Sequence, residues 1–258
     1  MVTIVVPARF QSQRFRGKPL AMLRGAKGVE KSLIQRSWEA GRAVPEATRV
    51  IIATDDERIA SHARGFGAEV MMTSATAANG TERCAEVAHH LPEAEMIVNL
   101  QGDAPLTPPE FVSAVIAGMD GAHMATPVLK ADTQTLRRLR ADRQQGMVGG
   151  TTAVLNAQNN ALYFSKEVLP YADNLAPQDT VFHHVGLYAY RPEALRRYAA
   201  WAMGPLERIE GLEQLRFLEN GVPVRCVEVE CKGRVFWEVN NPQDIERVEK
   251  ALADMGIE

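Results

Sequence analysis

A cluster of cations directly follows the first apolar run of the chain. The run Thr3–Val6 leads into a loop that carries Arg9, Arg14, Arg16 and Lys18 within ten residues. Small residues in this loop let backbone N–H groups approach an oxyanion, and the cations supply positive charge. The GxxxxGK[ST] pattern of a Walker A motif does not occur here. A solvated basic loop is the alternative, but so many cations at the end of an expected strand favour phosphate binding.

A lone carboxylate, Asp103, stands in the turn that follows another apolar run, Met96–Leu100. In open α/β sheets, ligands bind beyond the carboxyl ends of the strands, so we expect Asp103 to face the basic loop. Mg²⁺ sites often combine one or two carboxylates with substrate phosphate oxygens. The alternative is that Asp103 only caps a turn. Together with the basic loop, it predicts a phosphate site that uses Mg²⁺.

Two more polar segments follow expected strands. The loop Thr73–Arg83 is rich in small polar residues and runs into a helix, which suits contact with a base or a phosphate. A capped surface loop is the alternative reading of that segment. Asp55 and Asp56 follow the run Arg49–Thr54, and we expect Asp56 to cap the next helix.

Polar side chains in the second half of the chain could bind a hydroxylated substrate. His183 and His184 open an apolar run, where a histidine is usually a satisfied core residue. The segment Gly204–Asn220 is expected to be a buried helix, and its polar side chains share one face. A solvated face is the default alternative. That face comprises Glu207, Glu210 and Gln214, with Glu213 to one side.

The elements of the first 120 residues alternate between strand and helix. Near-continuous apolar strands separated by amphipathic helices predict a mostly parallel sheet with helices on both faces. The expected strands are Thr3–Val6, Arg49–Thr54, Glu69–Met72 and Met96–Leu100, and the expected helices are Val29–Ala43, Glu57–Arg64 and Thr81–His90.

After about residue 120 the alternation is less regular. Asn241 and Pro242 are expected to open the last helix as N-cap and first residue. Its apolar stripe is Ile245, Val248, Leu252 and Met255. No repeat or linker divides the chain, so we expect one α/β domain over residues 1–258. The expected strands are His123–Val128, Thr152–Leu155, Ala161–Phe164, His184–Tyr190, Val222–Val229 and Val235–Val239.

Composition excludes several functional classes. The 258 residues carry a net charge of −3, so no global field attracts nucleic acid or an anionic membrane. No apolar run reaches the length of a membrane span, and the start of the chain reads as a strand and not as a signal peptide. The three cysteines are an odd number without CxxC spacing, which favours reduced thiols in a cytoplasmic protein over a metal site.

Seven motifs in the same order resemble one known family. The segments are PARFQSQRFRGKPL, ATDDERI, NGTERCAEV, NLQGDAPL, ALYFS, HHVGLYAYR and LERIEGLEQLRFLENG. They are similar to the 3-deoxy-manno-octulosonate (KDO) cytidylyltransferases and cover nearly the whole chain. The resemblance implies a Rossmann-like nucleotide-diphospho-sugar transferase fold and a cytoplasmic homodimer. It also implies transfer of CMP from CTP to KDO, with release of pyrophosphate and a role in lipopolysaccharide biosynthesis.

The same resemblance implies roles for individual residues. The nucleotide-binding part would cover about residues 1–120, and the sugar-binding and dimerisation part about residues 121–258. Arg9, Lys18 and Asp103 would be catalytic, and Asp103 and Asn240 would bind Mg²⁺. The nucleotide would contact Ala8, Arg9, Arg14, Lys18, Ser74, Gly80 and Arg83; the sugar acid would contact Gln101, His184, Tyr188, Glu213 and Gln214.

The chain departs from the family pattern mainly at its nucleotide and metal end. Arg16 replaces a proline, Ala104 replaces a glutamate and Thr152 stands where a lysine is expected. The family's His-x-Ser-Gly-Thr-Asp-Arg becomes residues 77–83 of this chain, Ala-Ala-Asn-Gly-Thr-Glu-Arg. In the family's C-terminal Val-Asp-Thr-Pro-Glu-Asp pattern, Asn240 replaces the second metal-binding aspartate. An amide oxygen can still bind Mg²⁺, but one negative charge is lost.

Two alternatives follow from these departures. One is a cytidylyltransferase for an amino-substituted KDO or a nonulosonic acid, and a panel of sugar acids would separate it from a KDO enzyme. The other is a non-catalytic paralogue, which would bind CTP without releasing pyrophosphate. The sequence does not identify the sugar acid or choose between CTP and UTP. A dehydrogenase is disfavoured because GxGxxG does not follow the first strand.

Overall fold

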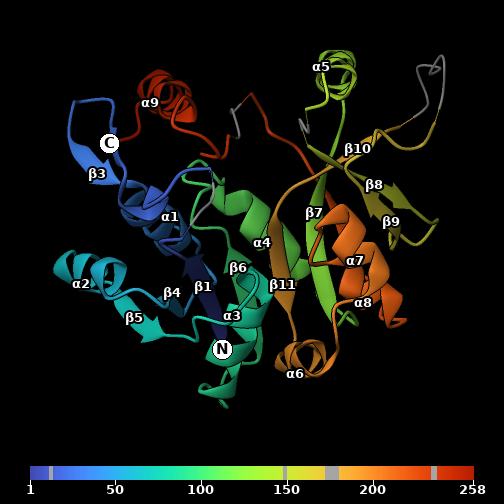
Figure 1. Ribbon diagram of the computed structural model, residues 1–258, viewed down its shortest axis with the longest axis horizontal. Coiled ribbons are helices and arrows are strands. Elements are labelled where there is room, and N and C mark those ends of the chain that lie inside the picture. Colours follow the sequence, from blue (N-terminus) through green and yellow to red (C-terminus); the bar gives the residue numbers. More distant parts are fainter. Residues whose placement is uncertain (12–13, 148–149, 172–179, 234–236) are drawn as a thin grey trace. The chain divides into compact units, whose positions relative to one another are not determined.

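The computed structural model describes residues 1–11, 14–147, 150–171, 180–233 and 237–258 (Figure 1). These residues form two units, one made of Met1–Ser113 with Cys231–Glu258 and the other of Ala114–Glu230. The C-terminal segment therefore belongs to the first unit, although the sequence analysis grouped it with the sugar-binding part. None of the described helices combines the length and the apolar character that crossing a bilayer requires.

The first unit is built on parallel strands in the order β5-β4-β1-β6. The register places Ala8 beside Thr54, so the carboxyl ends of the strands lie together on one side of the sheet, which is called its carboxyl edge below. Asp103 and the basic loop therefore emerge at the same edge. This confirms the expected parallel sheet. The strands are β1 (Val2–Ala8), β4 (Arg49–Thr54), β5 (Glu69–Met72) and β6 (Met96–Leu100).

Helices cover both faces of this sheet. The crossovers through α1 and α2 run in one direction along the sheet and the crossover through α3 runs back, so right-handed connections place α3 on the opposite face. Side chains cap α1, α2 and α3, and Asp56 accepts a hydrogen bond from the Arg58 amide at 3.0 Å, which confirms its predicted capping role. The helices are α1 (Leu33–Arg42), α2 (Glu57–Gly65), α3 (Gly80–His89), α4 (Pro109–Ala117), which contains the boundary between the units, and α9 (Asp244–Asp254).

The helix predicted over residues 29–43 was wrong in its first turn. Residues Glu30–Ser32 form β3, which pairs in antiparallel fashion with β2 (Met22–Arg24). Gly28, at a φ of 89°, takes part in the turn between them, a conformation that favours glycine. The Ser32 hydroxyl then accepts a hydrogen bond from the Gln35 amide and starts α1.

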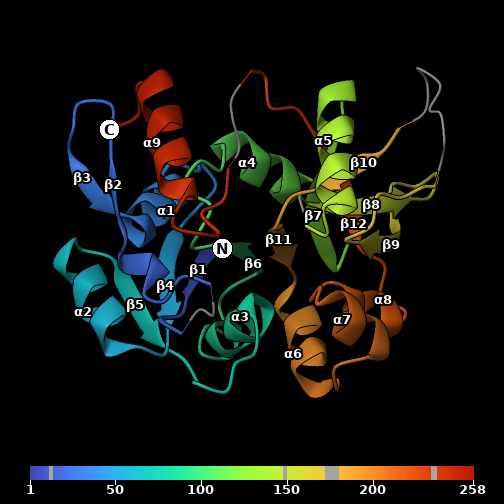
Figure 2. The same cartoon turned by 45° about the horizontal axis from the view of Figure 1, so that its top comes forward.

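The C-terminal segment packs by the predicted apolar stripe but starts its helix differently. Val248 and Leu252 are buried in a cluster that also contains Leu23 and Leu33, and α9 lies beside β2 (Figure 2). The N-cap predicted at residue 241 was wrong, because α9 begins at Asp244. The Asp244 carboxylate accepts hydrogen bonds from the backbone amides of residues 240 and 241. Of the strand predicted over 235–239, residues 237–239 are not in a strand, and 235–236 lie outside the described residues.

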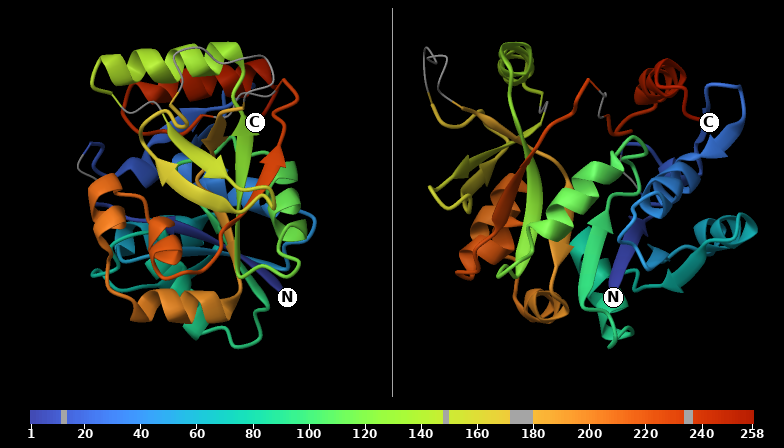
Figure 3. Two further views of the ribbon diagram at one scale, coloured as in Figure 1. Left: turned by 90° about the vertical axis from the view of Figure 1, so that its right-hand side faces the viewer. Right: turned by 180° about the vertical axis from the view of Figure 1, so that it is seen from behind.

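The second unit holds a mixed sheet in the order β11-β7-β10-β8-β9, and β12 pairs with β7 in parallel (Figure 3, right). The single strand predicted over 184–190 is two strands, interrupted at Val185 and Gly186. The predicted helix 204–220 is also two, because Gly211 adopts a left-handed φ of 63°. The elements are β7 (Met124–Lys130), β8 (Thr151–Leu155), β9 (Ala161–Ser165), β10 (Phe182–His184), β11 (Leu187–Tyr190), β12 (Arg225–Val229), α5 (Thr133–Gln144), α6 (Pro192–Ala200), α7 (Pro205–Glu210) and α8 (Leu215–Glu219).

The three cysteines are free thiols, as the sequence predicts. Burial raises the pKa of Cys226 to about 12, so this thiol is not a nucleophile near neutral pH.

Gly102 holds the turn after β6 against β1, and it provides a test of this packing. A Cβ at Gly102 would lie 2.6 Å from the Pro7 carbonyl oxygen, whereas a Cβ at Gly65, near the end of α2, meets nothing within 4 Å. We expect Gly102→Ala to lower the free energy of unfolding by about 1–3 kcal/mol through overpacking. Gly65→Ala should raise it by about 0.5–1 kcal/mol. Urea denaturation of both variants measures the contrast, and equal stabilities would contradict it.

Candidate active site

The basic loop after β1 is folded back on itself by Gly17. Its φ of 72° allows its amide to donate to the Phe10 carbonyl at 3.0 Å. The side chains of Arg9, Arg14 and Arg16 are exposed. Lys18 instead starts a short 3-10 turn, η1 (Lys18–Leu20), and its side chain is only 15% exposed. The loop thus presents three guanidinium groups to solvent and one fixed ammonium to the interior.

That ammonium joins three segments of the first unit. Lys18 Nζ lies 2.6 Å from Asp103 Oδ2 and donates a second hydrogen bond to the Val239 carbonyl at 2.9 Å. The Val239 amide donates in turn to the Asp103 backbone carbonyl at 2.9 Å. The sequence analysis placed Lys18 and Asp103 at one edge, and the structure brings them into contact. Arg14 also reaches this point, because its Nη2 donates to Asn240 Oδ1 at 3.1 Å.

Glu238 is a member of this cluster that the sequence analysis missed. Asn240 Nδ2 donates a long hydrogen bond of 3.5 Å to Glu238 Oε2. Burial, with a second contribution from the nearby Asp103 carboxylate, raises the pKa of Glu238 to about 7, against the opposing effects of Asn240, Lys18 and Arg14. The available signal was the spacing of Glu238 and Asn240, because alternate residues of an extended segment share one side.

The residues at this edge fit Mg²⁺. A group of three or more His, Cys, Asp or Glu side chains suited to holding a metal is absent from the described part of the chain. Asp103 offers a carboxylate and Asn240 an amide oxygen, both hard donors of the kind that Mg²⁺ prefers. Because Mg²⁺ usually keeps waters or substrate oxygens among its six ligands, a full protein cage is not needed.

The predicted nucleotide-binding residues of the Thr73–Arg83 loop are tied to one another. Arg83 is 4% exposed, and its guanidinium donates to Asp55 Oδ1 at 3.0 Å and to the Ser74 carbonyl at 3.2 Å. The Ser74 amide donates to Glu86 Oε2 at 2.7 Å. A Cβ at Gly80 would lie 2.9 Å from Asn99 Nδ2, so this position has no room for a side chain. Arg83 therefore positions the loop, and its contact with a nucleotide stays a prediction.

Three of the predicted sugar-binding residues lie together in the second unit. His184 Nε2 lies 2.9 Å from Thr126 Oγ1, and the His184 and Tyr188 ring centroids are 5.5 Å apart. The Tyr188 hydroxyl donates to Gln214 Oε1 at 3.3 Å. Gln214 is 1% exposed, and its Nε2 has no hydrogen-bond partner among the described residues. A buried donor without a partner is costly, which is typical of a group that meets a ligand.

The other polar residues of the predicted helix 204–220 have different surroundings. Glu207, 3% exposed, pairs with Arg216 at 2.6 Å, so its solvated-face interpretation was wrong. Glu210 accepts hydrogen bonds from the Ser165 hydroxyl at 2.7 Å and the Lys166 amide at 2.9 Å. Glu213 is half-buried, next to Gln214 in the chain. Gln101 belongs to the first unit, where its Nε2 donates to Asn99 Oδ1 at 3.4 Å.

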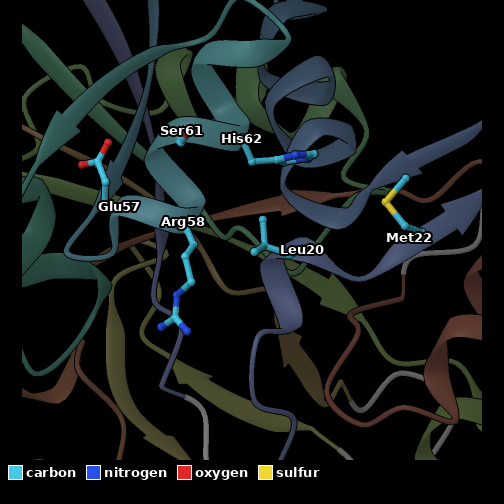
Figure 4. Close-up of a pocket in the computed structure, with 6 residues that line it drawn as sticks. All are labelled: Leu20, Met22, Glu57, Arg58, Ser61 and His62. Carbon is cyan, nitrogen blue, oxygen red and sulfur yellow. The ribbon is translucent and has the colours of Figure 1, made fainter.

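An open depression of about 720 Å³ in the first unit has no such chemistry (Figure 4). Its lining side chains come from α2 and from the segment Leu20–Met22. Arg58 is stacked 3.4 Å from the centre of the Phe10 ring, and His62 Nε2 lies 2.8 Å from Ser32 Oγ. None of the predicted site residues lines this depression, so we assign it no function.

A parallel sheet with a basic loop, a partly buried lysine and a carboxylate at the carboxyl ends of its strands is typical of α/β proteins of the nucleotidyltransferase class. Residues 3–226 match a family model described as Cytidylyltransferase. The chain belongs to the cytidylyltransferase family, which confirms the resemblance and the fold class.

Similarity to known proteins extends over the whole chain. This chain is 41% identical to the 3-deoxy-manno-octulosonate cytidylyltransferase of Maricaulis maris, and the alignment covers 99% of this chain and 98% of that protein. The enzyme of the same name from Chlamydia pneumoniae is 39% identical, over 96% of this chain and 92% of its own length. A solved structure of CMP:2-keto-3-deoxy-manno-octonic acid synthetase complexed with CTP superposes with a TM-score of 0.84 at 32% identity, covering 98% and 99% of the two chains.

The buried histidines predict how stability depends on pH. Burial lowers the pKa of His184 from 6.5 to about 3, with a further lowering by His183. Below pH 6.5 the imidazole of His184 binds a proton in the unfolded chain but stays neutral in the folded state. The free energy of unfolding therefore falls as pH falls. We expect His184→Gln to remove about 1–2 kcal/mol of the stability loss between pH 7 and pH 5.

Urea denaturation at both pH values measures this difference. His123→Gln, at an exposed histidine of the same unit, is the matched control and should keep the wild-type loss. An identical loss in wild type and His184→Gln would show that His184 is not a neutral buried group.

Proposed function

We propose that this chain transfers CMP from CTP to KDO and releases pyrophosphate. One observation carries the proposal: Lys18 and Asp103 meet at the carboxyl edge of a parallel sheet, in a chain that matches the CTP-bound synthetase over its full length. The match in sequence identity and coverage with enzymes of that name supports KDO as the acceptor.

The reaction is an in-line displacement at the α-phosphorus. The anomeric hydroxyl oxygen of the sugar acid forms the new P–O bond and loses its proton, while the bond to pyrophosphate breaks. Negative charge accumulates on the departing pyrophosphate, and fixed cations stabilise it without reorganising. Lys18 is such a fixed cation, because Asp103 and the Val239 carbonyl hold its ammonium in place. Arg9 and Arg14, which are exposed, would neutralise the outer phosphates.

Mg²⁺ is the proposed cofactor, with Asp103 and Asn240 as the residues that would hold it. When bound, it would supply positive charge to the phosphate oxygens and help to orient them. The neutral amide of Asn240 contributes an oxygen donor but no charge.

The residues of the second unit support recognition of a hydroxylated acceptor. The phenol of Tyr188 and the amide of Gln214 offer both donors and acceptors in a buried setting. Burial keeps His184 neutral at physiological pH, so it too offers a hydrogen bond and not a charge. The contacts of Gln101, His184, Tyr188, Glu213 and Gln214 with the sugar acid, like the homodimer and the cytoplasmic location, stay predictions.

The direct test is pyrophosphate release from CTP and KDO, titrated with Mg²⁺. Release that requires both substrates and the metal is expected. UTP and an amino-substituted KDO, tested in parallel, measure nucleotide and acceptor preference. Binding of CTP without pyrophosphate release at any metal concentration, with every acceptor, would contradict the proposed transfer.

Removal of either member of the ion pair tests its role in catalysis. We expect Lys18→Ala and Asp103→Ala each to lower turnover by about 100-fold or more, because the first removes a fixed cation from the transition state and the second removes the carboxylate that holds this cation in place. Lys250→Ala, at an exposed lysine of α9, is the matched control and should keep wild-type turnover. Circular dichroism checks that the variants fold, and near-normal turnover in either would remove that residue from its role.

A further inference from the structure

Glu238 and Asn240 flank a residue that is fixed by backbone hydrogen bonds. Val239 is fully buried, its amide donates to the Asp103 carbonyl, and its own carbonyl accepts from Lys18. Neighbours on either side of a residue in an extended segment point the same way. The 3.5 Å contact between Asn240 Nδ2 and Glu238 Oε2 shows that they do. The hydrogen bonds of Val239 therefore fix both side chains beside the Asp103 turn.

Among the described residues, the charged groups Asp103, Lys18 and Arg14 interact with Glu238. Asp103 is satisfied by Lys18 at 2.6 Å, and Asn240 Oδ1 is satisfied by Arg14 at 3.1 Å. The carboxylate of Glu238 accepts only the long bond from Asn240 within the described part of the chain. In its ionised form, a half-buried carboxylate with so weak a partner, close to a second carboxylate, would be stabilised by a further cation.

The charge of residue 240 affects how tightly a divalent cation binds. An amide oxygen can bind the metal, but metal affinity rises with the number of charged ligands. Asn240 provides no charge where the family pattern has an aspartate, whereas Glu238, two residues earlier and on the same side, does. We infer that Glu238 supplies the second carboxylate of the divalent-cation site, in place of the charge that residue 240 lacks. This inference rests on the proposed function of the same site.

A purely structural role would have different consequences. If Glu238 served only to balance Arg14 and Lys18, its replacement would change stability and leave metal affinity unchanged. A carboxylate introduced at residue 240 would then not compensate for the loss of Glu238. Metal affinity and rescue by the neighbouring position therefore separate the two roles.

The experiment measures binding of Mn²⁺, as a probe for Mg²⁺, to the purified full chain by electron paramagnetic resonance of the free ion, without nucleotide and with CTP present. The variants are Glu238→Gln, Glu238→Ala and the double variant Glu238→Gln/Asn240→Asp. Glu246→Gln is the charge-matched control, because it removes an exposed carboxylate of α9 in the same unit. Glu238→Ala keeps the test decisive if Glu238→Gln does not fold.

We expect both single replacements of Glu238 to weaken Mn²⁺ binding by about tenfold or more, with no such effect in Glu246→Gln. The double variant should recover to within about threefold of wild type, because it restores the number of carboxylates. Wild-type affinity in the Glu238 variants, or no recovery in the double variant, would overturn the inference.

Pyrophosphate release from CTP and KDO is measured on the same preparations, which separates the two proposals. If wild type releases no pyrophosphate but its Mn²⁺ affinity depends on Glu238, the proposed function fails and the inference stands. If wild type is active and its Mn²⁺ affinity does not depend on Glu238, the function stands and the inference fails.

Discussion

The ion pair between Lys18 and Asp103 is the constraint on which the geometry of the first unit's site depends. The two groups are 15% and 25% exposed, so neither is fully hydrated, and each would be costly without the other. Lys18 also donates to the carbonyl of Val239, which lies 221 positions away in the chain. One ammonium therefore fixes the end of the basic loop, the turn after β6 and the segment before α9.

Such a pair contributes more to specificity than to net stability. The desolvation of two charges offsets most of their attraction, so apolar side chains of similar volume could hold these segments equally well. What apolar side chains could not provide is a positive charge in a fixed place next to a carboxylate. Around this point, the backbone is arranged to keep the pair in position: Gly17 adopts a left-handed φ, and Asp244 accepts the amides of residues 240 and 241. The preorganisation that catalysis requires is thus built into the fold.

Much of the first unit could be predicted because its signals are local and repeated. Its strands β1, β4 and β6 are almost entirely buried and read as apolar runs, and its helices α1, α2 and α3 each have a buried apolar side and a side-chain cap. The errors arose where a single residue overrides the pattern. Gly211 breaks a segment that is otherwise apolar enough for one helix, and Ser32 delays α1 by offering its hydroxyl as a cap. Asn241 and Pro242 gave a strong start signal, but α9 begins at Asp244, whose carboxylate accepts hydrogen bonds from the amides of residues 240 and 241.

The site residues, too, could be predicted where a local sequence signal marks them and not where only a tertiary contact brings them together. Lys18 and Asp103 could be found because each follows a strand, and parallel strands bring their carboxyl ends together. The contacts of Tyr188 with Gln214 join β11 to the start of α8, and no spacing in the chain predicts them. The family pattern drew attention to residue 240, where a charge is lost, and away from residue 238, where one is present.

A family pattern specifies the position in the sequence at which a charged residue occurs. The affinity for a cation depends instead on where that charge lies in space. In an extended segment, a shift of two residues preserves the side from which a carboxylate approaches, and the additional methylene of glutamate extends its reach. The substitution at residue 240 therefore need not make the site less negative. Three-dimensional contacts, here the fixed Val239 between Glu238 and Asn240, decide whether a charge lost at one position is replaced at another.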